Sequence, residues 1–289
     1  MDRTWESAGR TVRKDVIKPG IFGKKPTECA ICNIRVANIQ VNNVSTDEKY
    51  LKKFHSEILD GKPDKIITIG EGCSELDRHL ERAIQMMMVD EKSLVSMIVF
   101  SEEVDQLVTV KVEITLTKLE SYKPIWQWTP EEKYLTALKY KEIGVQLYKG
   151  SRYVDAFHKF SKACKILITL EPIQDLELDR TLENNISNLR LVLYNNMAAC
   201  QLNRKNYEHT LSLCNKILKK EKDNVKALYR RGVAHGQLKD IENAVADLKT
   251  VILLDPQNHA AKDQFVIYNA KLQEANQRFQ ETIRRMFKA

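Results

Sequence analysis

The stretch Lys226-Ala-Leu-Tyr-Arg-Arg-Gly232 lies in a segment of the chain that repeats itself at a fixed interval. Asn206 is matched 34 residues later by Asp240, and Asn224 is matched at the same interval by Asn258. An interval of this length is typical of a repeated pair of helices, and one such pair cannot bury its apolar face alone. The stretch therefore predicts a stack of helical hairpins in the C-terminal half of the chain.

The residues inside the interval indicate which kind of repeat this is. Leu228 and Gly232 fall on the first helix of a hairpin and Ala244 falls on the second. Asp255-Pro256 ends the second helix because proline cannot continue one. This pattern is that of tetratricopeptide repeats. We expect a repeat domain at 133–289, with an insertion at 170–187, repeats near 137–170, 191–224 and 225–258, and a capping helix at 259–287.

Residues 1–120 have a different pattern, in which short apolar runs alternate with polar residues as they do in half-buried strands. One amphipathic helix is predicted within Gly72–Met88 and a short one near Glu48–Phe54, whereas residues 1–10 are expected to be unstructured. We therefore expect an α+β domain built from an antiparallel sheet and one helix. The runs predicted as strands are Val12–Ile17, Glu28–Ile39, Ile66–Ile69, Ser93–Phe100 and Leu107–Leu119.

Residues 121–132 are predicted to link the two domains. The segment contains Pro124 and Pro130, and Thr129 before Pro130 is a typical helix start. Trp126 and Trp128 are expected to pack the linker onto a domain rather than to bind a ligand.

The 289 residues carry a net charge of +7, with basic side chains interleaved with acidic ones. Interleaved charges favour an ordinary solvated surface, so no nucleic-acid partner is expected. The sequence has no run of about 18 apolar residues, so no membrane partner is expected either. The six cysteines are scattered, and Cys29 and Cys32 lack a second Cys or His pair with which to hold a metal. We expect a reduced protein of the cytoplasm, or of the nucleus, without a cofactor.

Motifs in both halves resemble the FKBP-type immunophilins that carry C-terminal tetratricopeptide repeats, in particular the divergent, FKBP-like ones. The resemblance implies an FKBP-like domain followed by an all-α repeat domain. The motifs that carry it are Ile17-Lys-Pro-Gly20, Leu80-Glu-Arg-Ala-Ile84, Leu116-Thr-Lys-Leu-Glu120, Lys226-Ala-Leu-Tyr-Arg-Arg-Gly-Val-Ala234 and Asp255-Pro-Gln-Asn258.

FKBP domains isomerise X–Pro bonds in a dry, aromatic pocket, and this chain departs from that pocket. Leu80 stands where the family has the tryptophan that floors the pocket, and Leu76-Asp77 places a carboxylate where an apolar side chain is expected. We therefore expect a degenerate, catalytically inactive domain that serves as a scaffold or a client-docking surface. The alternative is an active peptidyl-prolyl cis-trans isomerase of the FKBP class.

The repeats of the large immunophilins hold the C-terminal Glu-Glu-Val-Asp tail of a heat-shock chaperone with a clamp for two carboxylates. The resemblance places four clamp positions at Lys141, Asn196, Lys226 and Arg230, while Val145 stands where a fifth, amide donor is common. It implies heat-shock protein 90 as the partner, with heat-shock protein 70 as the second candidate. The remaining alternative is a general scaffold whose groove binds an internal helix or strand.

Overall fold

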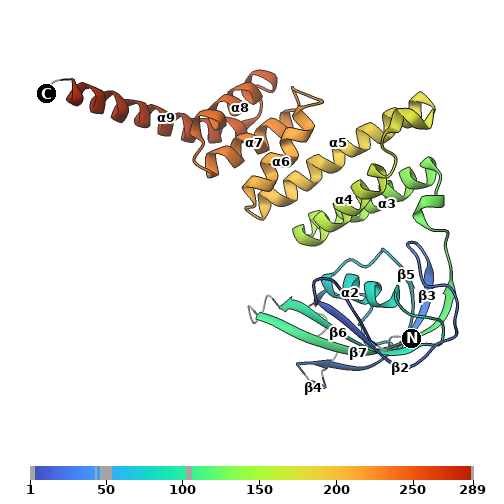
Figure 1. Cartoon of the computed structure of the whole chain (residues 1–289). Coiled ribbons are helices and arrows are strands. Elements are labelled where there is room, and N and C mark those ends of the chain that lie inside the picture. Colours follow the sequence, from blue (N-terminus) through green and yellow to red (C-terminus); the bar gives the residue numbers. More distant parts are fainter. Residues whose placement is uncertain (1–3, 43, 46–53, 102–105, 288–289) are drawn as a thin grey trace. The chain divides into compact units, whose positions relative to one another are not determined.

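The computed structural model describes residues 4–42, 44–45, 54–101 and 106–287 (Figure 1). The chain forms two compact units, Met1–Thr129 and Pro130–Ala289. The first unit is a sheet with one covering helix, and the second is helical throughout its described residues. The expected α+β domain followed by an all-α domain is confirmed.

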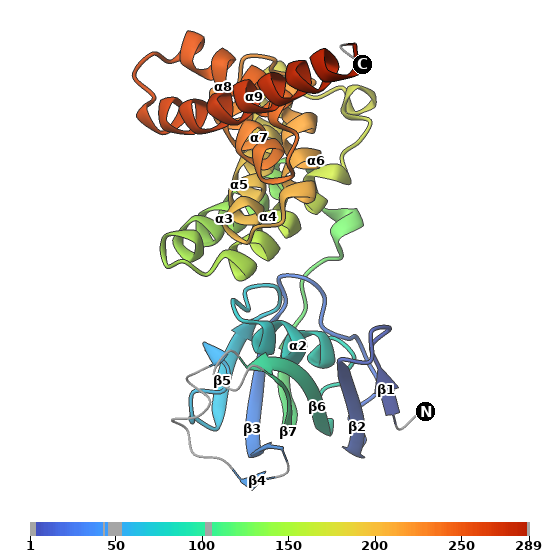
Figure 2. The same ribbon diagram turned by 90° about the vertical axis from the view of Figure 1, so that its left-hand side faces the viewer.

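The described part of the first unit contains one antiparallel sheet of seven strands, in the order β1-β2-β6-β7-β3-β4, with β5 also paired to β3. Figure 2 shows α2 (Glu75–Ile84) lying across one face of this sheet. The strands are β1 (Thr4–Glu6), β2 (Val12–Lys18), β3 (Ile31–Val41), β4 (Val44–Ser45), β5 (Asp64–Thr68), β6 (Lys92–Ser101) and β7 (Gln106–Glu120).

The core of this unit lies between α2 and the inner face of the sheet. Alternation in β7 aims Val110, Val112 and Ile114 inward, and each is fully buried. The helix starts at Ser74, whose hydroxyl accepts the backbone N–H of Asp77 at 3.0 Å, and it buries Leu76, Leu80 and Ile84 against the sheet. The predicted strands and the predicted helix between residues 72 and 88 are therefore confirmed.

One sequence-based expectation for the first unit is wrong. Residues 4–6 form β1, which pairs with β2 through Thr4–Asp15, Trp5–Lys14 and Glu6–Arg13, although residues 1–10 were expected to be unstructured. A segment of three residues is too short to show the alternation by which a strand is recognised in a sequence. These residues form a strand because they pair with β2. The short helix expected near 48–54 lies outside the described residues, apart from Phe54.

The segment before residue 130 belongs to the first unit. It contains a short 3-10 helix, η2 (Ile125–Gln127). Trp128 is 4% exposed, its indole N–H donates to the Lys123 carbonyl at 2.7 Å, and Tyr122 packs edge-on against it. Trp126 is 80% exposed, so only one of the two tryptophans packs as expected.

The second unit consists of three helical hairpins and a final helix, and η3 (Ile173–Leu176) precedes the second hairpin. Asn206, Asn224, Asp240 and Asn258, which recur at the 34-residue interval, each cap a helix with their side chain. The interval recognised in the sequence is therefore the spacing of equivalent helix starts. The helices are α3 (Pro130–Lys149), α4 (Tyr153–Ile168), α5 (Arg180–Asn203), α6 (Tyr207–Leu218), α7 (Val225–Gln237), α8 (Ile241–Leu254) and α9 (His259–Met286).

The last helix closes the stack with only its first half. A Cβ on Gly236 of α7 would lie 2.1 Å from the ring of Tyr268, so a glycine is needed for α9 to approach α7. Tyr268 is 2% exposed, whereas Phe279, farther along the same helix, is 66% exposed. No helix among the described residues is long and apolar enough to cross a bilayer.

Candidate peptide-binding site

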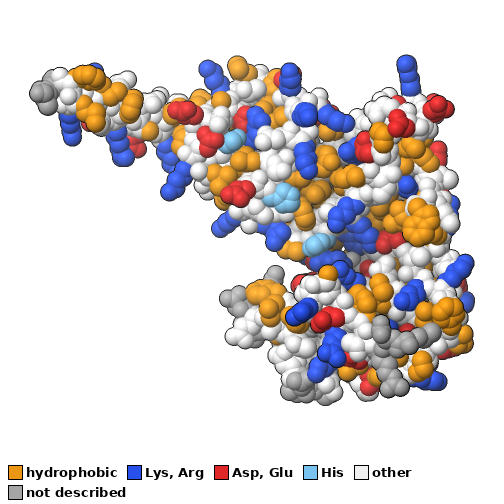
Figure 3. All heavy atoms as spheres, in the orientation of Figure 1, with side chains coloured by type: hydrophobic (Ala, Val, Ile, Leu, Met, Phe, Trp, Pro, Cys, Tyr) orange, Lys and Arg blue, Asp and Glu red, His pale blue; other side chains and the backbone are white. Residues whose placement is uncertain are grey.

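Among the first helices of the three hairpins, the middle one, α5, packs against both α3 and α7. Lys141 lies on α3, Asn196 on α5, and Lys226 and Arg230 on α7. The four predicted clamp residues are therefore distributed over three neighbouring helices. On the face drawn in Figure 3, Lys and Arg side chains are scattered among other groups.

Two of the four predicted residues line one cavity of about 300 Å³. Lys226 and Arg230 lie one helical turn apart on α7 and both reach it, whereas Lys141 and Asn196 are not among its lining residues. The other lining residues are Tyr148, Ala199, Leu202, Asn203, Val225, Tyr229 and Asn258.

Arg230 is the more buried of the two cations. Its Nη1 donates to Asn195 Oδ1 at 2.9 Å, and burial lowers the pKa of its guanidinium. The ionisable groups that act on this guanidinium in the described part of the chain are the thiols of Cys200 and Cys214 and two tyrosines. Burial raises the pKa of both thiols to about 12, so they are neutral at physiological pH. A half-buried cation without a carboxylate beside it is a favourable place for an anionic ligand.

The neighbouring residue, Arg231, binds side chains of other helices and does not line the cavity. Arg231 makes a bidentate pair with Asp247 at 2.8 and 2.7 Å and donates to Asn215 Oδ1 at 2.9 Å. It ties α7 to α8 and α6. Only Arg230 of the Arg230-Arg231 pair is therefore directed to the cavity.

Two of the lining residues that were not predicted as site residues, Tyr148 and Asn203, contact each other. Asn203 Nδ2 donates to the hydroxyl of Tyr148 at 2.9 Å and to the carbonyl of Ala199 at 2.9 Å. Because Tyr148 accepts this bond through its oxygen, its own O–H proton remains available to a ligand in the cavity. Tyr148 lies three residues after Val145 on α3, on the same helical face. This spacing could have identified Tyr148 in the sequence as a candidate replacement for the missing amide donor.

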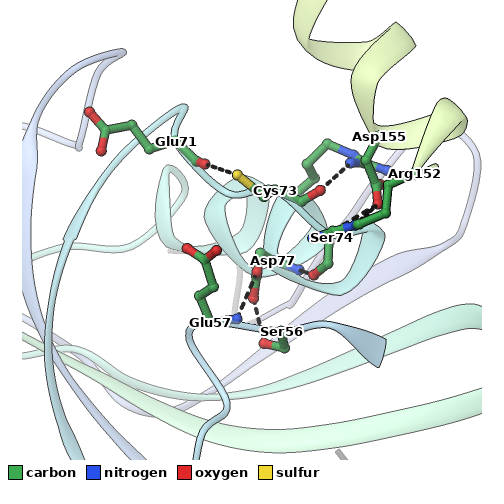
Figure 4. Close-up of polar contacts among 9 residues, drawn as sticks. Ser56, Glu57, Glu71, Cys73, Ser74, Asp77, Arg152 and Asp155 are labelled. Carbon is green, nitrogen blue, oxygen red and sulfur yellow. Dashed lines mark hydrogen bonds and ion pairs between the residues drawn. The ribbon is translucent and has the colours of Figure 1, made fainter. Parts of the chain in front are cut away.

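The residues of the predicted isomerase pocket lie in the core of the first unit. Leu76, Asp77 and Leu80 are 0 to 1% exposed. Figure 4 shows the Asp77 carboxylate, which accepts the Ser56 hydroxyl and the backbone N–H of Glu57 at 3.0 Å. It also accepts the backbone N–H of Ile58 at 3.3 Å. This carboxylate holds the 56–58 segment against α2. The position is structural and is not open to solvent.

Comparisons with known proteins agree with this architecture. The family model "BDBT FKBP like N-terminal" matches residues 5–121, and "Bride of doubletime-like, TPR domain" matches residues 129–212. The crystal structure of residues 1–211 of CG17282 superposes with a TM-score of 0.55 at 23% identity, covering 71% of this chain and 95% of that one. This likeness shows the fold.

Curated relatives extend the similarity along the chain. The human FK506-binding protein-like is 32% identical over 178 residues, covering 61% of this chain and 47% of the relative. The human peptidyl-prolyl cis-trans isomerase FKBP4 is 29% identical over 300 residues, covering 99% of this chain and 60% of the relative. The chain thus spans about half the length of the curated relatives it matches. The two matches, over residues 5–121 and 129–212, show that the chain has the architecture of an FKBP-like domain followed by tetratricopeptide repeats, similar to that of the Bride of doubletime-like proteins.

Proposed function

We propose that this protein is a non-catalytic co-chaperone, an adaptor whose repeats bind the Glu-Glu-Val-Asp tail of heat-shock protein 90. Lys141, Asn196, Lys226 and Arg230 form the carboxylate clamp. The observation that carries the proposal is the pair of cations, Lys226 and Arg230, in one cavity, with Arg230 half-buried and without a carboxylate beside it in the described part of the chain.

The energetics of such a clamp are sufficient for recognition. A charge-assisted hydrogen bond contributes about 1.5–3 kcal/mol. Three cations would therefore outweigh the cost of ordering a short flexible tail, which offsets much of the total. We expect roughly micromolar affinity, which corresponds to about −8 kcal/mol.

The missing amide donor at Val145 is compensated within the same cavity. The Tyr148 hydroxyl, held by Asn203 at 2.9 Å, lines the cavity that Lys226 and Arg230 share. A hydroxyl in this place can donate to a carboxylate as an asparagine amide would. The chain therefore has a neutral hydrogen-bond donor, the Tyr148 hydroxyl, near the position where Val145 stands instead of the usual asparagine.

The FKBP-like domain acts in this proposal as a scaffold or client-docking surface. Two observations support the absence of catalysis in this proposal. Leu76 and Leu80 are buried in the core, and the Asp77 carboxylate already accepts hydrogen bonds from three donors of the 56–58 segment. A protease-coupled proline-peptide assay on the full chain tests this part. Turnover clearly above the uncatalysed rate would favour an active isomerase.

Calorimetric titration of the full chain with acetyl-Met-Glu-Glu-Val-Asp tests the clamp. We expect binding by the wild type and at least about tenfold weaker binding by Lys226→Ala, which corresponds to the loss of about 1.4 kcal/mol. Lys222→Ala is the matched control, because Lys222 is an exposed cation outside the cavity, and it should bind like the wild type. No detectable heat from the folded wild type at millimolar peptide would contradict the proposal.

The same titration with the C-terminal tail peptide of heat-shock protein 70 compares the two candidate chaperones. Tighter binding of that tail would make heat-shock protein 70 the partner. Equal affinity for an internal peptide without a free C-terminal carboxylate would instead favour a general scaffold.

A further inference from the structure

A further cavity lies in the first unit, away from the degenerate isomerase position. Its volume is about 690 Å³, and it is enclosed by β1, β2, the 19–25 segment and the 86–91 segment that follows α2. Leu76, Asp77 and Leu80 do not line it. A volume of this size is within the range of about 300–1,000 Å³ that is usual for binding pockets. We call it the Trp5 cavity, after the tryptophan on β1 that lines it.

The wall of the Trp5 cavity is fixed by backbone contacts. The N–H of Ile21 donates to the Val89 carbonyl at 2.7 Å, which joins the 19–25 segment to the 86–91 segment. At Gly20 a Cβ would lie 2.3 Å from the Val89 oxygen, so only glycine allows this approach. The cavity is therefore preformed by two segments that the chain holds together.

A buried ion pair lines the Trp5 cavity. Lys14 and Glu91 are both 5% exposed, and their side chains form a salt bridge. Glu91 also accepts the Met88 N–H at 3.0 Å and the Ser93 hydroxyl at 2.7 Å. Lys14 also donates to the Met86 carbonyl at 3.1 Å, so two of its three N–H groups have acceptors in these contacts. The Glu91 carboxylate therefore has three hydrogen-bond donors around it. The Lys14 ammonium has one N–H group left that can donate to a ligand in the largely apolar cavity.

The rim of the Trp5 cavity is apolar and unusually exposed. Ile17 is 52% and Phe22 80% exposed. Exposed apolar side chains gathered in one place are typical of protein–protein contact sites. Lys25 lines the mouth and is exposed, and together with Lys14 it outnumbers Glu91 among the ionisable lining residues. The mouth therefore favours an acidic partner.

We propose that the Trp5 cavity is a docking site for a partner protein, which inserts one large apolar side chain flanked by acidic residues. A small molecule inside the cavity would leave Ile17 and Phe22 uncovered, whereas a polypeptide segment passing over the rim would cover both. The spare donor of Lys14 meets a carbonyl or carboxylate oxygen of that segment. Lys25 pairs with its acidic flank.

The probe that tests this proposal is a fluorescein-labelled octapeptide with blocked ends and a central Glu-Glu-Phe-Glu, titrated with the full chain and followed by fluorescence anisotropy. We expect a Kd of roughly 10–100 μM, and at least tenfold weaker binding when the central phenylalanine is replaced by alanine. Absence of binding at 1 mM protein, or equal binding of the alanine peptide, would overturn the proposal.

Two pairs of variants locate the site. Phe22→Ala should weaken binding about tenfold, whereas Ile66→Ala, which truncates a 74% exposed side chain on β5, should change it less than about twofold. Lys25→Glu should weaken binding about fivefold, whereas Lys24→Glu, with the same change of charge at an exposed residue that does not line the cavity, should have a smaller effect. Equal effects within either pair would place the peptide elsewhere.

The proposal is independent of the clamp in the repeats. Because both ends of the probe are blocked, it offers no free terminal carboxylate to Arg230. Arg230→Ala should therefore leave anisotropy binding unchanged while it removes binding of the chaperone tail. Loss of probe binding in Arg230→Ala would show that the probe occupies the repeats, and would overturn the assignment to the Trp5 cavity.

Discussion

Arg230 on α7 donates from Nη1 to Oδ1 of Asn195 on α5 at 2.9 Å, a contact between residues 35 positions apart. Asn195 precedes the predicted clamp residue Asn196 in the sequence. The contact therefore brings the turn of α5 that carries Asn196 next to the turn of α7 that carries Arg230. It joins the clamp position Arg230 to the residue before the clamp position Asn196, across neighbouring repeats.

Arg230→Ala should abolish detectable binding of the acetyl-Met-Glu-Glu-Val-Asp peptide, because it removes the half-buried cation of the cavity. Asn195→Ala should weaken binding less, by about three- to tenfold, since it removes only the bond that orients the guanidinium. Calorimetric titration of both variants makes the comparison. A larger effect of Asn195→Ala than of Arg230→Ala would contradict the assigned roles.

Gly236→Ala should destabilise the second unit by about 1–3 kcal/mol, because the added Cβ would lie 2.1 Å from the Tyr268 ring and push α9 away from α7. Gly150→Ala is the matched control, because the nearest neighbour of its Cβ would be the Leu147 carbonyl oxygen at 3.5 Å, an ordinary van der Waals contact. Urea unfolding followed by far-ultraviolet circular dichroism measures both. Equal stability of the two variants would mean that α9 does not depend on this contact.

Asp77→Ala should destabilise the first unit, since it leaves the Glu57 and Ile58 N–H groups without their acceptor at a cost of about 1–3 kcal/mol for each buried donor. Glu75→Ala, at an exposed position of the same helix, should cost less than about 1 kcal/mol. The three tryptophans, residues 5, 126 and 128, all belong to the first unit, so their fluorescence reports its unfolding. Equal losses of stability would show that the carboxylate is not structural.

The stability of the first unit should decline as the pH falls from about 6.5 towards 4, in part because of His79. Burial and the neighbouring Arg78 and Arg82 lower the pKa of His79 to about 4, from an ordinary value of 6.5. Between these values the unfolded chain binds a proton at His79 that the folded chain does not bind, so protonation favours unfolding. Above pH 6.5 this contribution to stability is fully present.

His79→Gln removes this titration and should therefore flatten the pH dependence. The measurement is urea unfolding at pH 7.5 and pH 5.0, followed by tryptophan fluorescence. His259→Gln, at an exposed position of the second unit, controls for the loss of a histidine. A His79→Gln profile parallel to that of the wild type would contradict the prediction.

Local periodicity predicted the fold well, for identifiable reasons. The alternation of β7 and the caps at Asn206 and Asp240 are properties of short stretches, and they can be read without knowledge of the rest of the chain. By contrast, β1 is a strand only because β2 lies beside it. Pairing partners that are distant in sequence leave no local signal.

The same distinction applies to the candidate sites. Lys226 and Arg230 were predicted as clamp residues from the family resemblance, and their spacing of one turn on a single helix places both on the same face. The Tyr148–Asn203 contact joins residues 55 positions apart, and it becomes visible only when α3 and α5 are placed side by side. The Trp5 cavity likewise combines β1, β2 and the 86–91 segment, which no sequence pattern connects.

The central claim is that the repeats recognise a free chain terminus through its carboxylates. The most direct measurement compares, by calorimetry on the full chain, acetyl-Met-Glu-Glu-Val-Asp with a free C-terminus and the same peptide with an amidated one. The account predicts roughly micromolar binding of the free acid and at least about tenfold weaker binding of the amide, since one of the two clamped carboxylates is lost. Equal affinities of the two peptides would contradict it.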